Sequence, residues 1–238
     1  MNGSRGPVER LLESPVTWLI TALNLGIFII AFTRGEMKDG SLSIETLYAF
    51  GANERGHVWY GGEYWRLVSC VFLHLGILHL LWNTWGMFGW CASIERTVGS
   101  LWFAFAYLTT GIGSFATSVL FRQGPSVGAS GAAFGMIAVT LALLHRRAGS
   151  WESFMSAPYV KSILVNTGVW VLIGFTMMQG VDNWAHLGGF AFGVPCGLLL
   201  EPPRGKRRPA WMLGLAAYMV VWVAVVGAAC TPGLGLNR

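Results

Sequence analysis

Long runs of apolar residues, separated by short stretches that carry charges or turn-forming residues, dominate the chain. Seven such runs occur near residues 15–33, 66–94, 99–121, 127–145, 162–180, 184–200 and 210–230. A helix that crosses a membrane needs about 20 mainly apolar residues. The pattern therefore predicts an all-α, polytopic membrane protein with seven transmembrane helices.

The composition agrees with this prediction. Of the 238 residues, 54% are hydrophobic and 11% are charged, whereas about 25% of the residues of a soluble domain are charged. The first run has the length of a true span and no small-residue cleavage site directly after it, so we expect a retained signal anchor. The four cysteines lack metal-ligand spacing, and no metal site is predicted.

The charged residues predict the orientation of the chain. When the loops are assigned alternately to two sides, one side holds ten basic and five acidic residues and the other holds six of each. The positive-inside rule then places the N-terminus in the cytoplasm and the C-terminus outside. The basic run "RGKRRP" at 204–209 is interpreted as an orientation signal with weak contact to anionic lipids. We expect no nucleic-acid partner, because no binding module surrounds this run.

A few polar residues fall inside the apolar runs, where such groups are costly and are functional candidates by default. They are His74, His79, Asn83 and His186, and Ser130 joins them because it lies in "SVGASG". Ser130 and His186 follow the starts of two runs that cross in the same direction. At 1.5 Å per residue, both side chains lie roughly 5 to 10 Å below the outer helix ends.

The second run allows two interpretations of depth. A straight helix from Trp65 would place His79 about 20 Å down, well below Ser130. If residues 66–75 instead form a partly embedded loop broken at Gly76, the helix begins near Ile77. His79 and Asn83 then lie near the outer end, on one helix face because of their i, i+4 spacing.

Small residues form a stripe on each of two runs. Such stripes let helix backbones approach closely, as a serine–histidine hydrogen bond between neighbouring helices requires. Generic packing of membrane helices also explains the stripes, but not the reactive group that heads each one. The stripes are His186, Gly189, Gly193 and Gly197 on one run and Gly128, Gly131, Gly135 and Ala138 beside Ser130 on the other.

These residues form a complete set for serine nucleophilic catalysis. A serine hydroxyl needs a base to take its proton, and His186 is the candidate base for Ser130. The Asn83 amide, a His79 ring N–H and the Ser130 backbone N–H could stabilise an oxyanion. Asp182, the nearest acid, is interpreted as a helix N-cap rather than a third catalytic group. The prediction is a Ser130–His186 dyad.

The same residues resemble those of the rhomboid intramembrane serine proteases. The matching segments are "YWR" at 64–66, "HLGILHLLWN" at 74–83, "ER" at 95–96, "GASG" at 128–131 and "AHLGGFAFG" at 185–193. The resemblance implies a six-helix core over residues 15–200. The predicted organisation is then a cytoplasmic tail at 1–14, this core, and a basic linker with a seventh helix and outer tail at 201–238.

The resemblance also assigns roles to individual residues. It implies that Ser130 is the nucleophile and His186 the base, with His79 and Asn83 contributing to the oxyanion hole. Gly128 would keep the backbone open there, while Gly189 supports close packing. Phe134 would stack on the base, and the resemblance leaves His74 outside the catalytic set.

Three functions are compatible with the residues. The leading one is a serine endopeptidase, without metal or cofactor, that cleaves single-span membrane proteins near the outer face of a bacterial plasma membrane. The first alternative is a catalytically silent rhomboid-like protein that binds membrane clients. The second is a channel or proton-coupled transporter with His79 and His186 as a relay. The substrate and the oligomeric state are not predicted.

Overall fold

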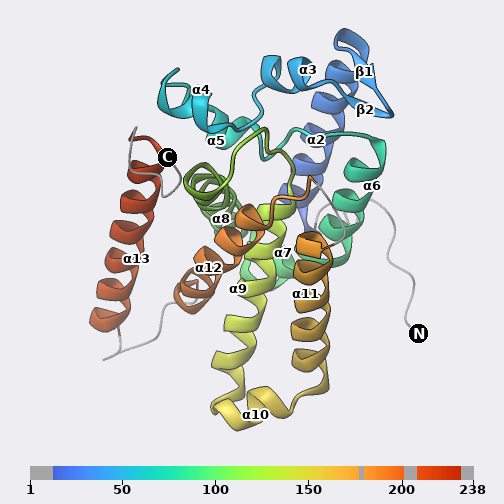
Figure 1. Cartoon of the computed structure of the whole chain (residues 1–238). Helices are drawn as coiled ribbons and strands as arrows, with labels where there is room; N and C mark the ends of the chain where they lie inside the picture. Colours follow the sequence, from blue (N-terminus) through green and yellow to red (C-terminus); the bar gives the residue numbers. More distant parts are fainter. Residues whose placement is uncertain (1–12, 177–179, 201–207, 232–238) are drawn as a thin grey trace, which may run out of the picture.

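The computed structural model describes residues 13–176, 180–200 and 208–231, and a helix occupies each predicted apolar run (Figure 1). The predicted N-terminal tail, the basic linker and the outer C-terminal tail fall mostly outside these residues. The helices at these runs are α2 (Pro15–Arg34), α6 (Ile77–Gly86), α7 (Ala92–Val98), α8 (Ser100–Phe121), α9 (Ser130–Ala148), α11 (Pro158–Thr176), α12 (Asn183–Leu199) and α13 (Arg208–Ala229). A π-helical turn, Met87–Cys91, joins α6 to α7.

Within the described residues, three helices are by themselves long and apolar enough to cross a membrane: α2, α8 and α11. Helices α9 and α12 are instead rich in small residues, as expected for helices that pack closely against other helices. Large apolar side chains are exposed on α2, α6 and α11, a pattern that suits contact with lipid tails. They include Leu19, Leu23, Leu78, Leu81, Val165 and Leu172.

The second span differs from the continuous run at 66–94. Residues 66–69 form a separate short helix, α5 (Arg66–Ser69), and α6 begins at Ile77 after an extended Gly76. A β-bridge between Gly76 and Ser41 holds this break against the first loop. The interpretation with a break at Gly76 is therefore confirmed, and the straight helix from Trp65 is wrong. The break places His79 in the first turn of α6.

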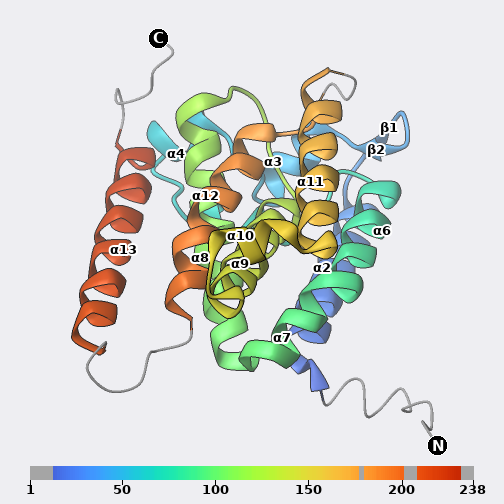
Figure 2. The same ribbon diagram turned by 90° about the horizontal axis from the view of Figure 1, so that it is seen from below.

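Helices α8, α9 and α12 form the centre of the molecule (Figures 1 and 2). In both views α2, α6 and α11 lie on one side of this centre and α13 on the other. The central packing brings together small residues and large apolar side chains, among them the fully buried Phe103, Tyr107 and Met136. The helices that carry Ser130 and His186 thus belong to the enclosed centre of the fold.

A buried carboxylate, Glu95 of α7, fixes the start of α2. Its two oxygens accept hydrogen bonds from the backbone amides of Val16 (2.9 Å) and Thr17 (2.7 Å) and from the Thr17 and Ser100 hydroxyls (2.7 and 2.6 Å). The first amides of a helix have no intrahelical acceptor, and a negative charge there is favoured by the helix dipole. Glu95 therefore joins α2, α7 and the start of α8 at one end of the molecule.

The long first loop covers the opposite end and has its own structure. It contains β1 (Met37–Lys38) paired with β2 (Ser41–Leu42), and α3 (Ile44–Ala49) and α4 (Arg55–Trp59). The buried Arg66 side chain holds the loop together. It pairs with Glu63 at 2.6 Å and donates to the carbonyls of Tyr48 (2.7 Å) and Ala52 (3.1 Å). Because of the Arg66 hydrogen bond, the pKa of the Glu63 carboxyl lies below its usual value.

The last helix, α13, is attached to both the core and the first loop. The Trp222 indole donates to the Thr109 carbonyl of α8 at 2.9 Å, and the Trp59 indole of α4 donates to the Ala229 carbonyl at 2.5 Å. Tyr218 packs edge-on against Phe192 of α12. The helix at the seventh run is thereby packed into the fold, while its crossing of a membrane remains a prediction.

Candidate active site

Ser130 and His186 lie within hydrogen-bonding distance of each other. The Ser130 hydroxyl is 2.9 Å from Nε2 of His186, and both side chains are half-buried. Ser130 is the first residue of α9, and His186 lies in the first turn of α12. The structure thus brings together the two residues that the sequence placed at one depth.

Two neighbours orient the His186 ring. Its Nδ1 lies 3.4 Å from the Asn183 side-chain oxygen, and Phe134 stacks on its face with ring centroids 4.3 Å apart and an interplanar angle of 7°. If Nδ1–H donates to Asn183, the Nε2 atom carries a lone pair directed at Ser130. This is the tautomer that a general base toward the serine requires.

Glycines let the two helices approach backbone to backbone. A Cβ atom at Gly189 would overlap the carbonyl oxygen of Gly131, and one at Gly193 would overlap that of Gly135. The His186–Gly189–Gly193 stripe therefore packs directly on α9, as the sequence pattern predicts. This approach is what brings a short serine side chain to the histidine ring.

Gly128 differs from its predicted place on the α9 stripe. It precedes the helix, has a φ of +125°, and donates its amide to the Cys70 carbonyl at 2.9 Å. A Cβ there would lie 2.7 Å from Cε1 and 2.8 Å from Nε2 of His79. Only glycine meets both conditions without strain. Gly128 therefore leaves room for the His79 ring beside Ser130.

His79 and Asn83 lie together on α6. The Leu75 amide donates to Nδ1 of His79 at 3.4 Å, so the proton of the neutral ring is on Nε2, the ring nitrogen that faces Gly128. The Asn83 amide donates to the His79 carbonyl at 2.9 Å and keeps a second N–H. His74 is fully buried beside His79, with ring centroids 5.2 Å apart, and its ring nitrogens have no partner among the described residues.

Comparisons with known proteins identify the family. The family model of the Rhomboid domain matches residues 61–203, more than half of the chain. The chain belongs to the rhomboid family. This membership and the apolar helices make it an integral membrane protein.

Several curated proteins are similar to this rhomboid. "Rhomboid protease GluP" of Bacillus subtilis is 33% identical over 213 residues, which cover 88% of this chain and 39% of that protein. "RHOMBOID-like protein 4" of Arabidopsis thaliana is 37% identical over 184 residues, 76% of this chain and 45% of that protein. "Rhomboid-type serine protease 2" of Emericella nidulans is 32% identical over 158 residues, 65% of this chain and 30% of that protein. This rhomboid thus spans less than half the length of these relatives.

The start of α12 holds contacts that sequence reasoning missed. Asp182 is the N-cap of α12, as predicted, and accepts from the Ala185 amide at 3.0 Å. Its second oxygen also accepts hydrogen bonds from the hydroxyls of Ser118 and Ser126. The sequence indicates the acidic N-cap, but nothing in the spacing joins it to serines more than 50 residues earlier.

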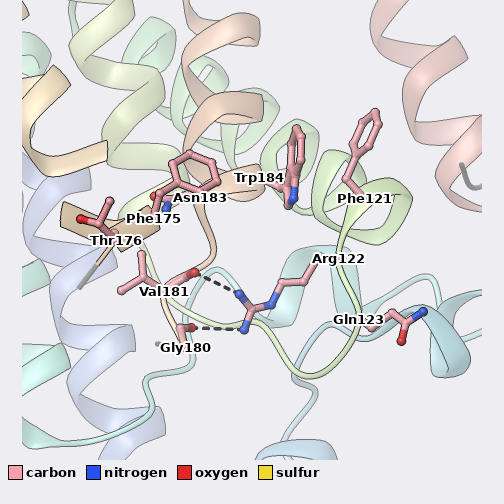
Figure 3. A pocket seen from close by; sticks show the side chains of 10 residues that line it. Phe121, Arg122, Gln123, Phe175, Thr176, Gly180, Val181, Asn183 and Trp184 are labelled. Atoms are coloured by element: carbon pink, nitrogen blue, oxygen red, sulfur yellow. Dashed lines mark hydrogen bonds between the residues drawn. The ribbon is translucent and has the colours of Figure 1, made fainter. Parts of the chain in front are cut away.

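A cavity of about 390 Å³ adjoins this region of the rhomboid, between the ends of α8 and α11 and the start of α12 (Figure 3). The Arg122 guanidinium at its wall donates to the carbonyls of Val181 (3.0 Å) and Gly180 (3.2 Å). Asn183, which faces His186, also lines it. The end of α8 therefore holds the segment that leads into the His186 helix.

The predicted absence of a metal site remains a prediction. Within residues 13–176, 180–200 and 208–231, no three His, Cys, Asp or Glu side chains are grouped to hold a metal ion. The cysteines at 70, 91 and 196 are buried as free thiols.

Proposed function

We propose that this rhomboid is an intramembrane serine endopeptidase in which Ser130 is the nucleophile and His186 the general base. The observation that carries the proposal is the 2.9 Å contact between the Ser130 hydroxyl and Nε2 of His186. Related proteins named as rhomboid proteases support the same reaction class. The mechanism requires no metal or cofactor.

The first half of the reaction is acyl transfer. His186 takes the Ser130 proton through Nε2 while the hydroxyl oxygen attacks the peptide carbonyl carbon. The resulting imidazolium then gives the proton to the leaving amine, and the peptide C–N bond breaks. In the second half, His186 takes a proton from water, whose oxygen attacks the carbonyl carbon of the acyl–serine ester. The ester C–O bond then breaks, the Ser130 oxygen takes the proton back from His186, and the new carboxyl group leaves. Asn183 and Phe134 hold the ring through both steps.

The oxyanion formed in each step needs hydrogen-bond donors fixed before the reaction. The Nε2–H of His79 lies beside the open Gly128 position, and the Ser130 amide is at a helix start, where amides have no intrahelical acceptor. The second N–H of Asn83, which the His79 carbonyl does not use, is a third donor. Removal of one such donor typically costs about 10²–10³ in kcat.

The expected substrates are single-span membrane proteins whose helices contain small, helix-breaking residues near the outer face. The site lies at the end of the helices covered by the first loop, opposite the end fixed by Glu95. The positive-inside rule assigns the Glu95 end to the cytoplasm. We infer a bacterial plasma membrane location with the N-terminus inside and the C-terminus outside.

The experiment that tests the proposal compares wild type with Ser130→Ala and His186→Ala. Purified proteins in detergent are treated with a fluorophosphonate probe and, separately, with a reporter that contains one transmembrane helix. Wild type is expected to be labelled and to cleave, and both variants to lose cleavage and labelling. Two variants serve as matched controls. Ser153→Ala lies at an exposed position of helix α10 (Trp151–Ser156), and His57→Ala lies in the first loop.

The alternatives make different predictions in the same experiment. A catalytically silent rhomboid-like protein would bind the reporter without cleavage in wild type and in both variants. A proton relay through His79 and His186 would leave Ser130 without activation, so that neither wild type nor the variants would be labelled or cleave the reporter. Unchanged labelling in either variant would overturn the Ser130–His186 dyad.

A further inference from the structure

We propose that Asp182 is a positioning residue that fixes the His186 helix relative to the oxyanion segment before Ser130. The inference rests on the proposed protease function. Asp182 does not contact either catalytic side chain through its carboxylate, and its position is explained by three other hydrogen bonds. These bonds reach three separate parts of the fold, α12, α8 and the loop at 122–129.

The first bond sets the start of α12. Asp182 Oδ1 accepts from the Ala185 amide at 3.0 Å, and the Asp182 carbonyl accepts from the His186 amide at 3.2 Å. A side-chain N-cap of this kind typically contributes about 0.5–2 kcal/mol to a helix. His186 therefore lies in the helical turn that Asp182 caps. A shift of Asp182 would move the His186 ring.

The second oxygen connects this helix start to the loop that precedes Ser130. Oδ2 accepts from the Ser126 hydroxyl at 2.6 Å and from the Ser118 hydroxyl of α8. Hydrogen bonds to an ionised carboxylate are roughly twice as strong as neutral ones. Asp182 is 9% exposed and Ser126 is 4% exposed, so water competes little for these contacts.

Ser126 transmits this connection to the oxyanion side. Its backbone exchanges two hydrogen bonds with Asn53 of the first loop, at 2.8 and 3.0 Å. Two residues later, Gly128 is tied to the Cys70 carbonyl and packs against His79. The Asp182–Ser126 bond is thus a direct side-chain link between the base's helix and the segment 126–128.

Arg122 holds the same region in a different way. Its guanidinium binds the carbonyls of Gly180 and Val181 and does not involve Ser126 (Figure 3). Arg122 fixes the approach to α12, whereas Asp182 joins that helix to the loop at 126–128. The contribution of Asp182 is therefore separable from general attachment of this segment to α8.

The test measures kcat and KM for cleavage of a transmembrane reporter by the variants Asp182→Ala, Asp182→Asn and Ser126→Ala. Only the monodisperse fraction from size-exclusion chromatography is assayed, and rates are given per amount of that protein. A misplacement of about 1 Å between reacting groups can cost 10²-fold in rate. Asp182→Ala is expected to lower kcat by about a hundredfold and Ser126→Ala by about tenfold, with KM changed less than threefold. Asp182→Asn keeps the N-cap acceptor and is expected to recover at least tenfold over Asp182→Ala.

A double variant tests the route of the effect. If Asp182 acts partly through Ser126, Asp182→Ala with Ser126→Ala together should be no slower than Asp182→Ala alone. Asp39→Asn, on an exposed turn of the first loop, is the control. Wild-type kcat in monodisperse Asp182→Ala, or fully multiplicative losses in the double variant, would overturn the proposal. Absence of cleavage by wild type itself would instead refute the protease function.

Discussion

Gly189 packs against the carbonyl oxygen of Gly131, so that α12 and α9 touch through their backbones next to the Ser130–His186 pair. A side chain at this place would meet a backbone atom, which cannot rotate away. The close approach of Ser130 and His186 therefore depends on two residues that have no side chains. The chemistry proposed for this site depends on packing as much as on the reactive groups.

Replacement of Gly189 by alanine should separate the two helices. Overpacking of a close contact typically costs about 1–3 kcal/mol, so the thermal unfolding midpoint in detergent should fall and reporter cleavage should be lost. Gly168→Ala in α11 is the matched control, because its Cβ would enter open space. That change should leave cleavage intact and raise helix stability by about 0.5–1 kcal/mol. If the two variants had the same unfolding midpoint and the same cleavage rate, the close packing at Gly189 would not be needed.

Gly128→Ala should damage the oxyanion site without removing a reactive group. The new Cβ would force the His79 ring to move, and loss of one oxyanion donor typically lowers kcat by about 10²–10³. Gly124→Ala provides the comparison, since Gly124 also has a positive φ, +86°, but faces open space. The Gly124→Ala variant therefore introduces the backbone strain, about 1–2 kcal/mol, without a clash with another side chain. If both variants label with fluorophosphonate at the wild-type rate, His79 has no role at this position.

Much of this arrangement is predictable from local sequence. Apolar runs predict the helices, and the glycine stripe on α12 predicts the close contact with α9. The depths of Ser130 and His186 below their helix starts are enough to pair the two residues. The same comparison of depths favours a helix start at Ile77, which the structure confirms. These features follow from helix periodicity and from the length of apolar segment that a bilayer requires. Both can be read from a single sequence.

Other features depend on contacts between distant segments. Ser126 and Asp182 are 56 residues apart, and no periodicity relates them. Gly128 looks like part of the α9 stripe, yet the helix begins two residues later, because Gly128 adopts a positive φ beside His79. The internal structure of the first loop follows from Arg66 and its carbonyl partners. Such geometry requires the folded chain.

Phe134→Leu should weaken catalysis through the orientation of the base. The ring of Phe134 lies parallel to that of His186, and aromatic pairs contribute about 0.5–1.5 kcal/mol beyond their buried area. Because 1.36 kcal/mol corresponds to tenfold in rate, we expect a decrease in kcat of up to about tenfold. Phe121→Leu removes a comparable stack, on Trp184 at 4.8 Å, that does not involve His186. Steady-state cleavage rates should fall only in the Phe134 variant; a similar fall in both would point to a general packing effect.

Glu95→Gln should destabilise the fold while it leaves the chemistry of the site unchanged. Each carboxylate oxygen accepts two hydrogen bonds, so an amide NH₂ at either position would face the donors of α2 and Ser100. Loss of hydrogen bonds to a buried charge should lower the free energy of unfolding by about 3 kcal/mol. Glu152→Gln, exposed in the first turn of α10, is the control and should unfold like wild type.

Thermal unfolding in detergent measures the difference in stability between Glu95→Gln and wild type. Cleavage by the folded Glu95→Gln variant at low temperature should keep the wild-type kcat. A wild-type midpoint for Glu95→Gln would show that the start of α2 does not need this carboxylate, whereas a selective loss of kcat would place Glu95 in communication with the site at the opposite end.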